Sequence, residues 1–212
     1  MGIMVCMILT YHTGACVKIT AGDTTLVFGP VSKSSKNFKP TNFGADIALV
    51  SFNHPDMNGV TEAGRGDREP FAIFGPGEYQ VKGVTVAGFP AASSYGGASG
   101  TNTVYTVNFD GMHVLYLGAL EETKIPAELL EMDAPDILIV PVGSNGVLKP
   151  DDAHDLAVKL EAKIMIPILF DDKSLKLFLK EAGAEGTSPV EKLTIKPKDI
   201  ADKENEVVVL AV

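Results

Sequence analysis

The arrangement of apolar residues changes after Leu117, and this change constrains the fold more than any other feature of the chain. Up to that residue, short β-rich runs are separated by Gly, Asp, Pro and Ser, as strands joined by turns require. Asp110-Gly111 is the strongest hairpin signal among these turns. We therefore expect strands over residues 4–9, 15–19, 24–28, 46–50, 71–74, 83–88, 103–108 and 113–117, and a polar, basic loop over 31–43.

After Leu117, helical and strand patterns alternate. Helices are expected over 125–132, from Pro150 onward with one apolar face, and over 171–182, where Asp171 or Asp172 caps the start and Gly183 follows the end. Strands are expected over 136–142, 163–168 and 206–212. Because no linker is long enough to separate the two halves, the sequence predicts two sheets packed face to face with helices outside, in a single domain over residues 1–212.

Composition narrows the function classes. The chain has 212 residues, 45% of them hydrophobic, and its 18 basic and 27 acidic residues give a formal net charge of -9. This charge has the wrong sign for a protein that binds nucleic acid or an anionic membrane through a positive field. The apolar start lacks a basic n-region, and no apolar run approaches the ~18 residues that span a bilayer. Cys6 and Cys16 have the surroundings of buried thiols, so we expect a reducing, cytoplasmic location.

Several strings in a fixed order resemble the metallo-β-lactamase superfamily, and within it a branch of small metal-dependent hydrolases related to ascorbate-6-phosphate lactonase. The strings are Phe38-Lys-Pro, Gly44-Ala-Asp-Ile-Ala-Leu-Val, Gly75-Pro-Gly-Glu-Tyr, Lys82-Gly-Val, Thr101-Asn-Thr-Val-Tyr, Asp110-Gly-Met-His-Val-Leu-Tyr-Leu-Gly, Asp136-Ile-Leu-Ile-Val-Pro-Val-Gly and Ile164-Met-Ile-Pro. The likeness covers nearly the whole chain. It implies an α+β fold, the four-layer αββα sandwich.

The same resemblance implies a metal site that this chain has largely lost. In the family, a strand leads into Thr-His-x-His-x-Asp-His, whose side chains hold one or two metal ions; here the string reads Ser-Phe-Asn-His-Pro-Asp-Met over residues 51–57. His54 and Asp56 match the second His and the Asp, whereas Phe52 and Met57 replace the first and third His. The remaining family positions fall on Ser93 or Ser94, on Ala119 in place of the bridging Asp, on Leu169 in place of the last His, on Gly29 of Gly29-Pro30, and on Gly14 unless His12 takes its place.

These replacements predict a repacked site. A catalytic zinc needs about three protein ligands and an open position for water, and Phe, Ala and Leu offer no lone pair. Bulky apolar groups at positions that converge in the family can fill the space of a metal and its water, at ~1.5–3 kcal/mol for each buried side chain. We therefore expect His54 and Asp56 to be vestigial metal ligands that now form a hydrogen-bonded pair or cap the next segment.

Two other interpretations of these residues stay open. A reduced or relocated metal site could draw its ligands from His54, Asp56, His12, Glu121 and Asp67. Alternatively, Ser93 or Ser94 could act as a nucleophile with His54 as its base.

His113 and His154 are expected at the surface, and the adhesion-like tripeptide Arg65-Gly-Asp67 is expected to be a chance match.

The sequence thus favours a protein that is non-catalytic or catalytically degenerate, a pseudoenzyme that acts by binding or assembly. We expect no cofactor, a homo-oligomer, no nucleic-acid or membrane partner, and a small-molecule ligand that the sequence does not identify. The alternative is a metal-dependent hydrolase of small ester, lactone or phosphate-bearing substrates, with zinc or another divalent metal in an atypical site.

Overall fold

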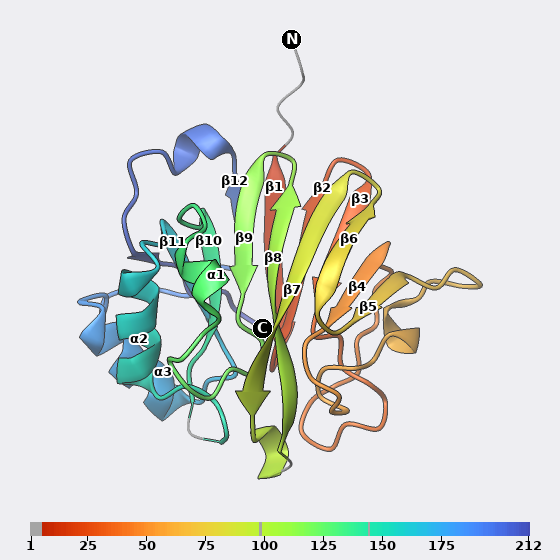
Figure 1. Ribbon diagram of the computed structural model, residues 1–212, viewed down its shortest axis with the longest axis horizontal. Coiled ribbons are helices and arrows are strands. Elements are labelled where there is room, and N and C mark those ends of the chain that lie inside the picture. The colour runs from red at the N-terminus through yellow and green to blue at the C-terminus, as the bar shows by residue number, and fades with distance from the viewer. Residues whose placement is uncertain (1–5, 98, 144) are drawn as a thin grey trace.

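Two mixed β-sheets lie face to face in the computed structural model, which describes residues 6–97, 99–143 and 145–212 (Figure 1). The six-stranded sheet has the order β12 (Leu193–Ile195), β1 (Met7–Thr13), β2 (Cys16–Ala21), β3 (Thr24–Phe28), β4 (Ile47–Val50), β5 (Phe71–Phe74). The seven-stranded sheet has the order β13 (Glu206–Val207), β11 (Ile164–Ile168), β10 (Ile137–Pro141), β9 (Met112–Tyr116), β8 (Gly100–Phe109), β7 (Val84–Ser93), β6 (Gly77–Val81).

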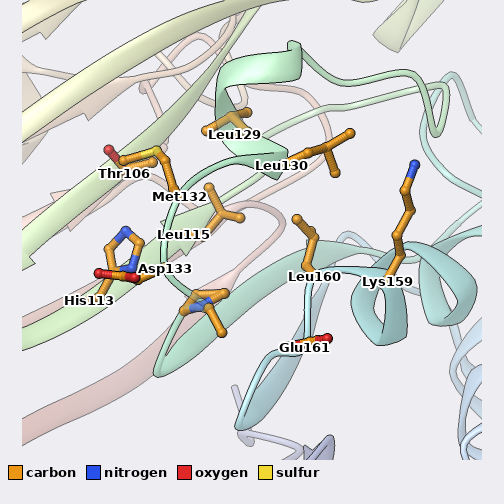
Figure 2. A pocket seen from close by; sticks show the side chains of 12 residues that line it. Thr106, His113, Leu115, Leu129, Leu130, Met132, Asp133, Lys159, Leu160 and Glu161 are labelled. Carbon is orange, nitrogen blue, oxygen red and sulfur yellow. The ribbon is translucent and has the colours of Figure 1, made fainter.

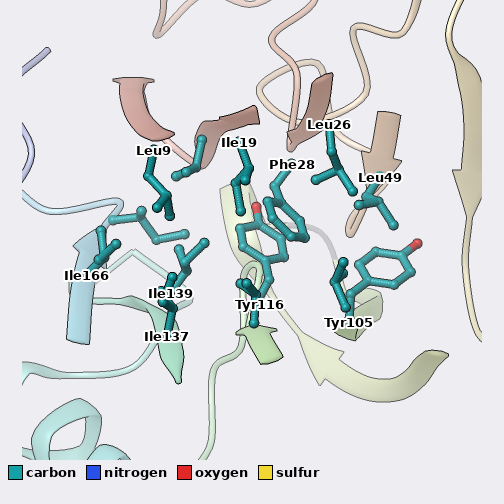
Figure 3. Packing of buried hydrophobic residues seen from close by; sticks show 14 of the residues in the cluster. Leu9, Ile19, Leu26, Phe28, Leu49, Tyr105, Tyr116, Ile137, Ile139 and Ile166 are labelled. Carbon is teal, nitrogen blue, oxygen red and sulfur yellow. The ribbon is translucent and has the colours of Figure 1, made fainter. Parts of the chain in front are cut away.

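The largest apolar cluster lies between the sheets (Figure 3). Side chains alternate in direction along each strand, so every second residue reaches this layer. The six-stranded sheet contributes residues such as Leu9, Ile19 and Phe28, and the seven-stranded sheet contributes Tyr116 and Ile139. The rings of Phe28 and Tyr116 stack across the interface with centroids 4.4 Å apart.

The outer faces of the two sheets are covered differently. Helices α1 (Ala127–Leu130), α2 (Pro150–Lys159) and α3 (Asp172–Glu181) pack on the seven-stranded sheet, where Leu138 and Met165 meet helix residues such as Leu156 and Phe178. On the six-stranded sheet, a small cluster joins Val27 and Ala48 to the loop after β3 and to the 3₁₀ turn η1 (Thr61–Ala63). The predicted α+β sandwich is therefore confirmed, with one outer layer reduced to a 3₁₀ turn and loops.

Most expected elements are present, and the differences have local causes. The predicted helix over 125–132 is only the four-residue α1, since Pro126 precedes it and residues 131–134 are exposed. Strand β6 was missed because Gly75, Pro76 and Gly77 are typical of a turn; both glycines have positive φ, and the strand starts at the second. The expected last strand over 206–212 is the two-residue β13 followed by a single bridge from Leu210 to Val190.

Further details concern short elements and single residues. The three-residue β12 was not predicted, and residues 4 and 5 of the expected first strand lie outside the described residues. Asp171 caps α3 in a reciprocal pair of hydrogen bonds with Ser174, and Gly183 follows the helix with a φ of 63°, as the sequence predicted. No helix in the described ranges is both long and apolar enough to cross a membrane.

Candidate functional site

The residues at the family's metal positions come together at one end of the sandwich. They lie in the loop after β4, in the β1–β2 turn, and beyond the ends of β9 and β11. The backbone N–H of Leu169 donates to the carbonyl oxygen of Gly14 at 2.9 Å, which joins the end of β11 to the β1–β2 turn. Phe52, Met57 and Ala119 belong to the cluster between the sheets, against which Leu169 also packs.

Apolar side chains fill this region. Phe52 is only 5% exposed and meets the ring of Tyr95 edge-on at 6.5 Å, while Met57 and Ala119 are fully buried. The hydroxyl of Ser51 donates to the Met57 sulfur at 3.6 Å. Leu169 is half-buried with a φ of 54°, so it contributes less to the packing than the sequence led us to expect.

A neighbouring loop occupies the place of the missing hairpin histidine. A Cβ atom built at Gly14 would lie 2.7 Å from Cε2 of Phe38, and Gly14 has a φ of 58°. A side chain at this position would therefore clash with the Phe38 ring and adopt a backbone conformation that favours glycine. The loop over residues 32–38, which we call the covering loop, closes the side of the site that the β1–β2 turn would otherwise line.

The carboxylate of Asp56 is fully buried and holds the covering loop. Ser35 Oγ donates to one carboxylate oxygen at 2.6 Å, and Asn37 Nδ2 donates to the other at 2.8 Å. The Tyr95 hydroxyl donates to that second oxygen at 2.9 Å. Burial, and then the neighbouring Asp56, raises the pKa of Tyr95, so this hydroxyl keeps its proton and remains a donor.

His54 lies beside Asp56, and one of its ring nitrogens faces both the backbone N–H and the carboxylate of that residue. Its Nδ1 accepts the backbone N–H of Asp56 at 3.2 Å and lies 3.5 Å from the Asp56 carboxylate. The contact with the backbone N–H is the shorter of the two. The ring packs edge-on against Tyr95 at 5.2 Å, and the pairing of His54 with Asp56 therefore runs through the backbone.

The other candidate ligands have separate surroundings. The His12 ring packs on Phe43 with centroids 4.3 Å apart, and burial followed by Lys18 lowers its pKa to about 4. Glu121 accepts a hydrogen bond from Ser94, and Asp67 is exposed in a turn. Within the described ranges, no three His, Cys, Asp or Glu side chains meet in an arrangement that could hold a metal ion. The donor set present does not fit the metal that the fold implies.

The serine-nucleophile interpretation required His54 as the base, and the hydrogen bonds of Ser93 and Ser94 run to other groups. Ser94 Oγ donates to Glu121 at 2.7 Å, and Ser93 Oγ accepts the backbone N–H of Tyr95 at 3.2 Å. Neither hydroxyl is hydrogen-bonded to His54 in the described part of the chain. His113 and His154 are both partly exposed, on β9 and α2, in agreement with the surface positions expected for them.

A separate cavity of about 170 Å³ lies outside this region, between α1 and the end of α2 (Figure 2). Leu129, Leu130 and Leu160 line it, with His113 and Asp133 at its polar side. None of the residues at the family's metal positions contributes to its walls, so this cavity cannot stand for the family's active site.

Sequence reasoning missed the residues that complete the surroundings of Asp56. Ser35 and Asn37 lie in a loop that the sequence predicted only as polar and basic, and the sequence assigned no role to Tyr95. A hydrogen bond between residues 19, 21 or 39 apart leaves no periodic pattern in a sequence, so no local signal marks these three partners.

Comparison with known proteins identifies the family. The family model described as "Beta-lactamase superfamily domain" matches residues 8–169. The chain is similar to the UPF0173 metal-dependent hydrolase YtkL of Bacillus subtilis, with 24% identity over 196 residues, 78% of this chain and 86% of the relative. A UPF0173 metal-dependent hydrolase of Listeria monocytogenes is 25% identical over 208 residues, 78% of this chain and 86% of the relative.

Solved structures agree with this assignment. A candidate Zn-dependent hydrolase of the metallo-β-lactamase superfamily from Thermotoga maritima superposes with a TM-score of 0.73 and 28% identity, covering 96% of this chain and 98% of that one. The metallo hydrolase Igni18 of Ignicoccus hospitalis gives a TM-score of 0.63 with 17% identity, over 90% of this chain and 98% of that one. Because the family model spans most of the sequence and the sandwich matches these structures, this chain belongs to the β-lactamase superfamily and has the metallo-β-lactamase fold.

Proposed function

We propose that this protein has lost the metal chemistry of its family and acts by binding or assembly. The observation that carries the proposal is the hydrogen bonding of Asp56. Its buried carboxylate accepts hydrogen bonds from the side chains of Ser35, Asn37 and Tyr95. Three donors from the protein itself take the place that a cation would have at this side chain. The apolar side chains of Phe52 and Met57 support the same conclusion, since they fill two adjacent ligand positions.

The chemistry of hydrolysis explains why this arrangement is disabling. A catalytic zinc lowers the pKa of its bound water to ~7 and so supplies the nucleophile at neutral pH. It needs about three protein ligands with one position left open. Here His54 Nδ1 and the Asp56 carboxylate are both engaged with other groups, and no third ligand joins them within the described ranges. Among the described residues, the old site then holds no set of ligands that could generate this nucleophile.

The names of the relatives favour a second candidate, and on the comparisons alone it is the better supported of the two. The Bacillus and Listeria relatives are named metal-dependent hydrolases. On this alternative, the protein is a metal-dependent hydrolase of small ester, lactone or phosphate-bearing substrates with an atypical site for zinc or another divalent ion. It would have to free Asp56 from its three donors and recruit ligands that the described residues do not bring together.

Metal-dependent stabilisation distinguishes the two candidates. A ligand at 100 times its dissociation constant stabilises a folded protein by ~2.7 kcal/mol, which is ~5–10 °C in melting temperature for a chain of this size. We expect Zn²⁺, Mn²⁺ and Fe²⁺, each added to chelator-treated protein, to leave the melting temperature within ~1 °C of its value without metal. A rise of several degrees that is absent in Asp56→Ala would show a bound metal, overturn the metal-loss proposal and favour the hydrolase candidate.

A further inference from the structure

The cavity of about 170 Å³ beside α1 is built by four segments of the chain (Figure 2). Residues of β8 and β9 form its floor, on the outer face of the seven-stranded sheet. One side is formed by α1 with the residues that follow it, and another by the end of α2. Because strands and helices supply most of this wall, the packing of the fold holds the cavity in place.

The inner part of the cavity is apolar. Leu115, Leu129 and Leu160 line it and are 2%, 4% and 7% exposed. Leu130, 43% exposed, and Met132, 40% exposed, also line it, so they lie where the cavity opens to solvent. An apolar cavity of about 150 Å³ accepts one benzene ring, and a methionine sulfur makes favourable contacts with ring edges. The cavity therefore has the size and the lining for a single aromatic ring.

Thr106 on β8 brings a polar group into the cavity. The residue is only 5% exposed, and no hydrogen bond joins its hydroxyl to another described residue. The hydroxyl is not sealed in the interior, since the one fully buried side-chain oxygen or nitrogen without a partner in the described ranges is Oδ1 of Asn205. Hydroxyl groups buried to this degree are normally hydrogen-bonded, so this one is available to a molecule that enters the cavity.

His113 lies on the same face of the sheet as Thr106. Thr106 pairs with Leu115 across β8 and β9, and side chains two residues apart on a strand point the same way. The backbone N–H of His113 donates to Asp136 at 2.8 Å, whereas its ring makes no hydrogen bond within the described part of the chain. A neutral imidazole keeps one nitrogen as an acceptor. The cavity thus offers a hydroxyl and an imidazole that no other described residue uses.

The charges around the cavity favour a cation. Asp133 and Glu161 contribute carboxylates to its wall, whereas Lys159 is the only lysine or arginine among the described lining residues. The cavity also adjoins the C-terminal end of α2, where Leu160 is the C-cap. Carbonyl groups at a helix C-terminus carry a partial negative charge, which adds to the effect of the two carboxylates.

We propose that this cavity binds a small primary amine whose apolar body is a single aromatic ring. The ring fills the apolar inner part, and the ammonium group lies at the end where Figure 2 shows Thr106, His113 and Asp133. An ammonium group has three N–H donors and no acceptor, and these three side chains offer it a hydroxyl oxygen, a ring nitrogen and a carboxylate. A carboxylate ligand would instead meet like charges at Asp133 and Glu161.

The inference rests on the binding half of the proposed function and gives it a ligand class. The residues of this cavity lie apart from the former metal site, so metal content and amine binding are separate measurements, and a failure of one leaves the other standing. A ligand of about nine non-hydrogen atoms in a cavity that is open on one side binds weakly, with a dissociation constant on the order of 1 mM.

Titration of the full chain with phenethylamine, followed through the methyl NMR signals of its leucines, tests the proposal. The signals of Leu115, Leu129 and Leu160 should shift and reach saturation, whereas that of Leu26, which packs between the sheets, should stay in place. Phenethyl alcohol and phenylacetate carry the same ring without the positive charge. At neutral pH, both should bind at least about tenfold more weakly than the amine.

Two substitutions test the polar end of the cavity. Thr106→Val keeps the shape of the side chain and removes only the hydroxyl, while Asp133→Asn removes the charge. Each should raise the dissociation constant of phenethylamine by about three- to tenfold. The matched control Asp155→Asn, at a side chain on α2 that is 83% exposed and outside the cavity, should leave it unchanged.

Three results would each overturn the proposal. The first is phenethylamine that shifts none of the cavity leucines at roughly twenty times the expected dissociation constant. The second is phenylacetate or phenethyl alcohol that binds as tightly as the amine. The third is amine binding that neither Thr106→Val nor Asp133→Asn weakens.

Discussion

Asp56→Asn is the substitution that most sharply separates a repacked site from a metal site. It keeps the shape of the side chain but replaces one acceptor oxygen with an NH₂ group, which can only donate. In one orientation this group faces the Ser35 hydroxyl, and in the other it faces Asn37 Nδ2 and the Tyr95 hydroxyl. Either way at least one donor of the wild-type protein meets another donor.

The cost follows from these contacts. Hydrogen bonds to a charged group contribute ~1.5–3 kcal/mol each, and a buried donor left without a partner costs ~1–3 kcal/mol. Asn37 is exposed and Ser35 half-exposed, so water compensates part of their loss, whereas Tyr95 is only 5% exposed. We expect the free energy of unfolding to fall by ~2–4 kcal/mol, which lowers the melting temperature by ~5–12 °C in a chain of this size.

Thermal and urea unfolding in chelator measure this change directly, and Asp67→Asn, at an exposed carboxylate, provides the matched control. Active sites are often held at a cost in stability, so a true metal ligand would show the opposite behaviour: its replacement would leave the metal-free protein unchanged or more stable. An unaltered or raised melting temperature for Asp56→Asn would refute the reasoning.

Three further measurements test the surroundings of the site. The double variant Phe52→His with Leu169→His should have a free energy of unfolding in urea that is ~2–4 kcal/mol lower than that of the wild type. Most of this loss should come from the buried Phe52, because histidine tolerates the positive φ of Leu169 better than leucine does. An unchanged urea midpoint would contradict the repacking. Burial, and to a smaller extent Lys18, lowers the pKa of His12 from 6.5 to about 4. As the pH falls, the unfolded chain therefore binds a proton at His12 before the folded chain does, and the free energy of unfolding should decrease between about pH 6.5 and about pH 4. The variant His12→Gln should show a weaker pH dependence. Burial raises the pKa of Cys16 to about 12, so a disulfide reagent should label only Cys6 in the folded protein and both thiols after denaturation; rapid labelling of both would show that Cys16 is accessible.

The sequence predicted the architecture well where the pattern of apolar residues was long or strict. The run that became β10 is fully buried on both faces, and the apolar face of α2 packs as its spacing required. Asp110 and Gly111 both have positive φ in the hairpin that joins β8 to β9, as an Asp-Gly turn between strands requires. Each of these features is encoded by neighbouring residues.

Features that depend on distant residues were not predictable. The covering loop is fixed by Asp56, about twenty residues further along the chain, and by the packing of Phe38 on Gly14. Strand β6 is hidden by the turn-like glycines at its start. The position of Leu169 was expected from the resemblance, but its left-handed backbone was not, since leucine rarely adopts a positive φ.

The number of metal ions bound per chain tests the central claim most directly. Protein purified without chelator, from cells grown with zinc, manganese and iron, should contain far less than one equivalent of any of these metals, with the same value in His54→Ala. One or more tightly bound ions per wild-type chain, lost in His54→Ala, would show that the site still holds its metal and would contradict the account.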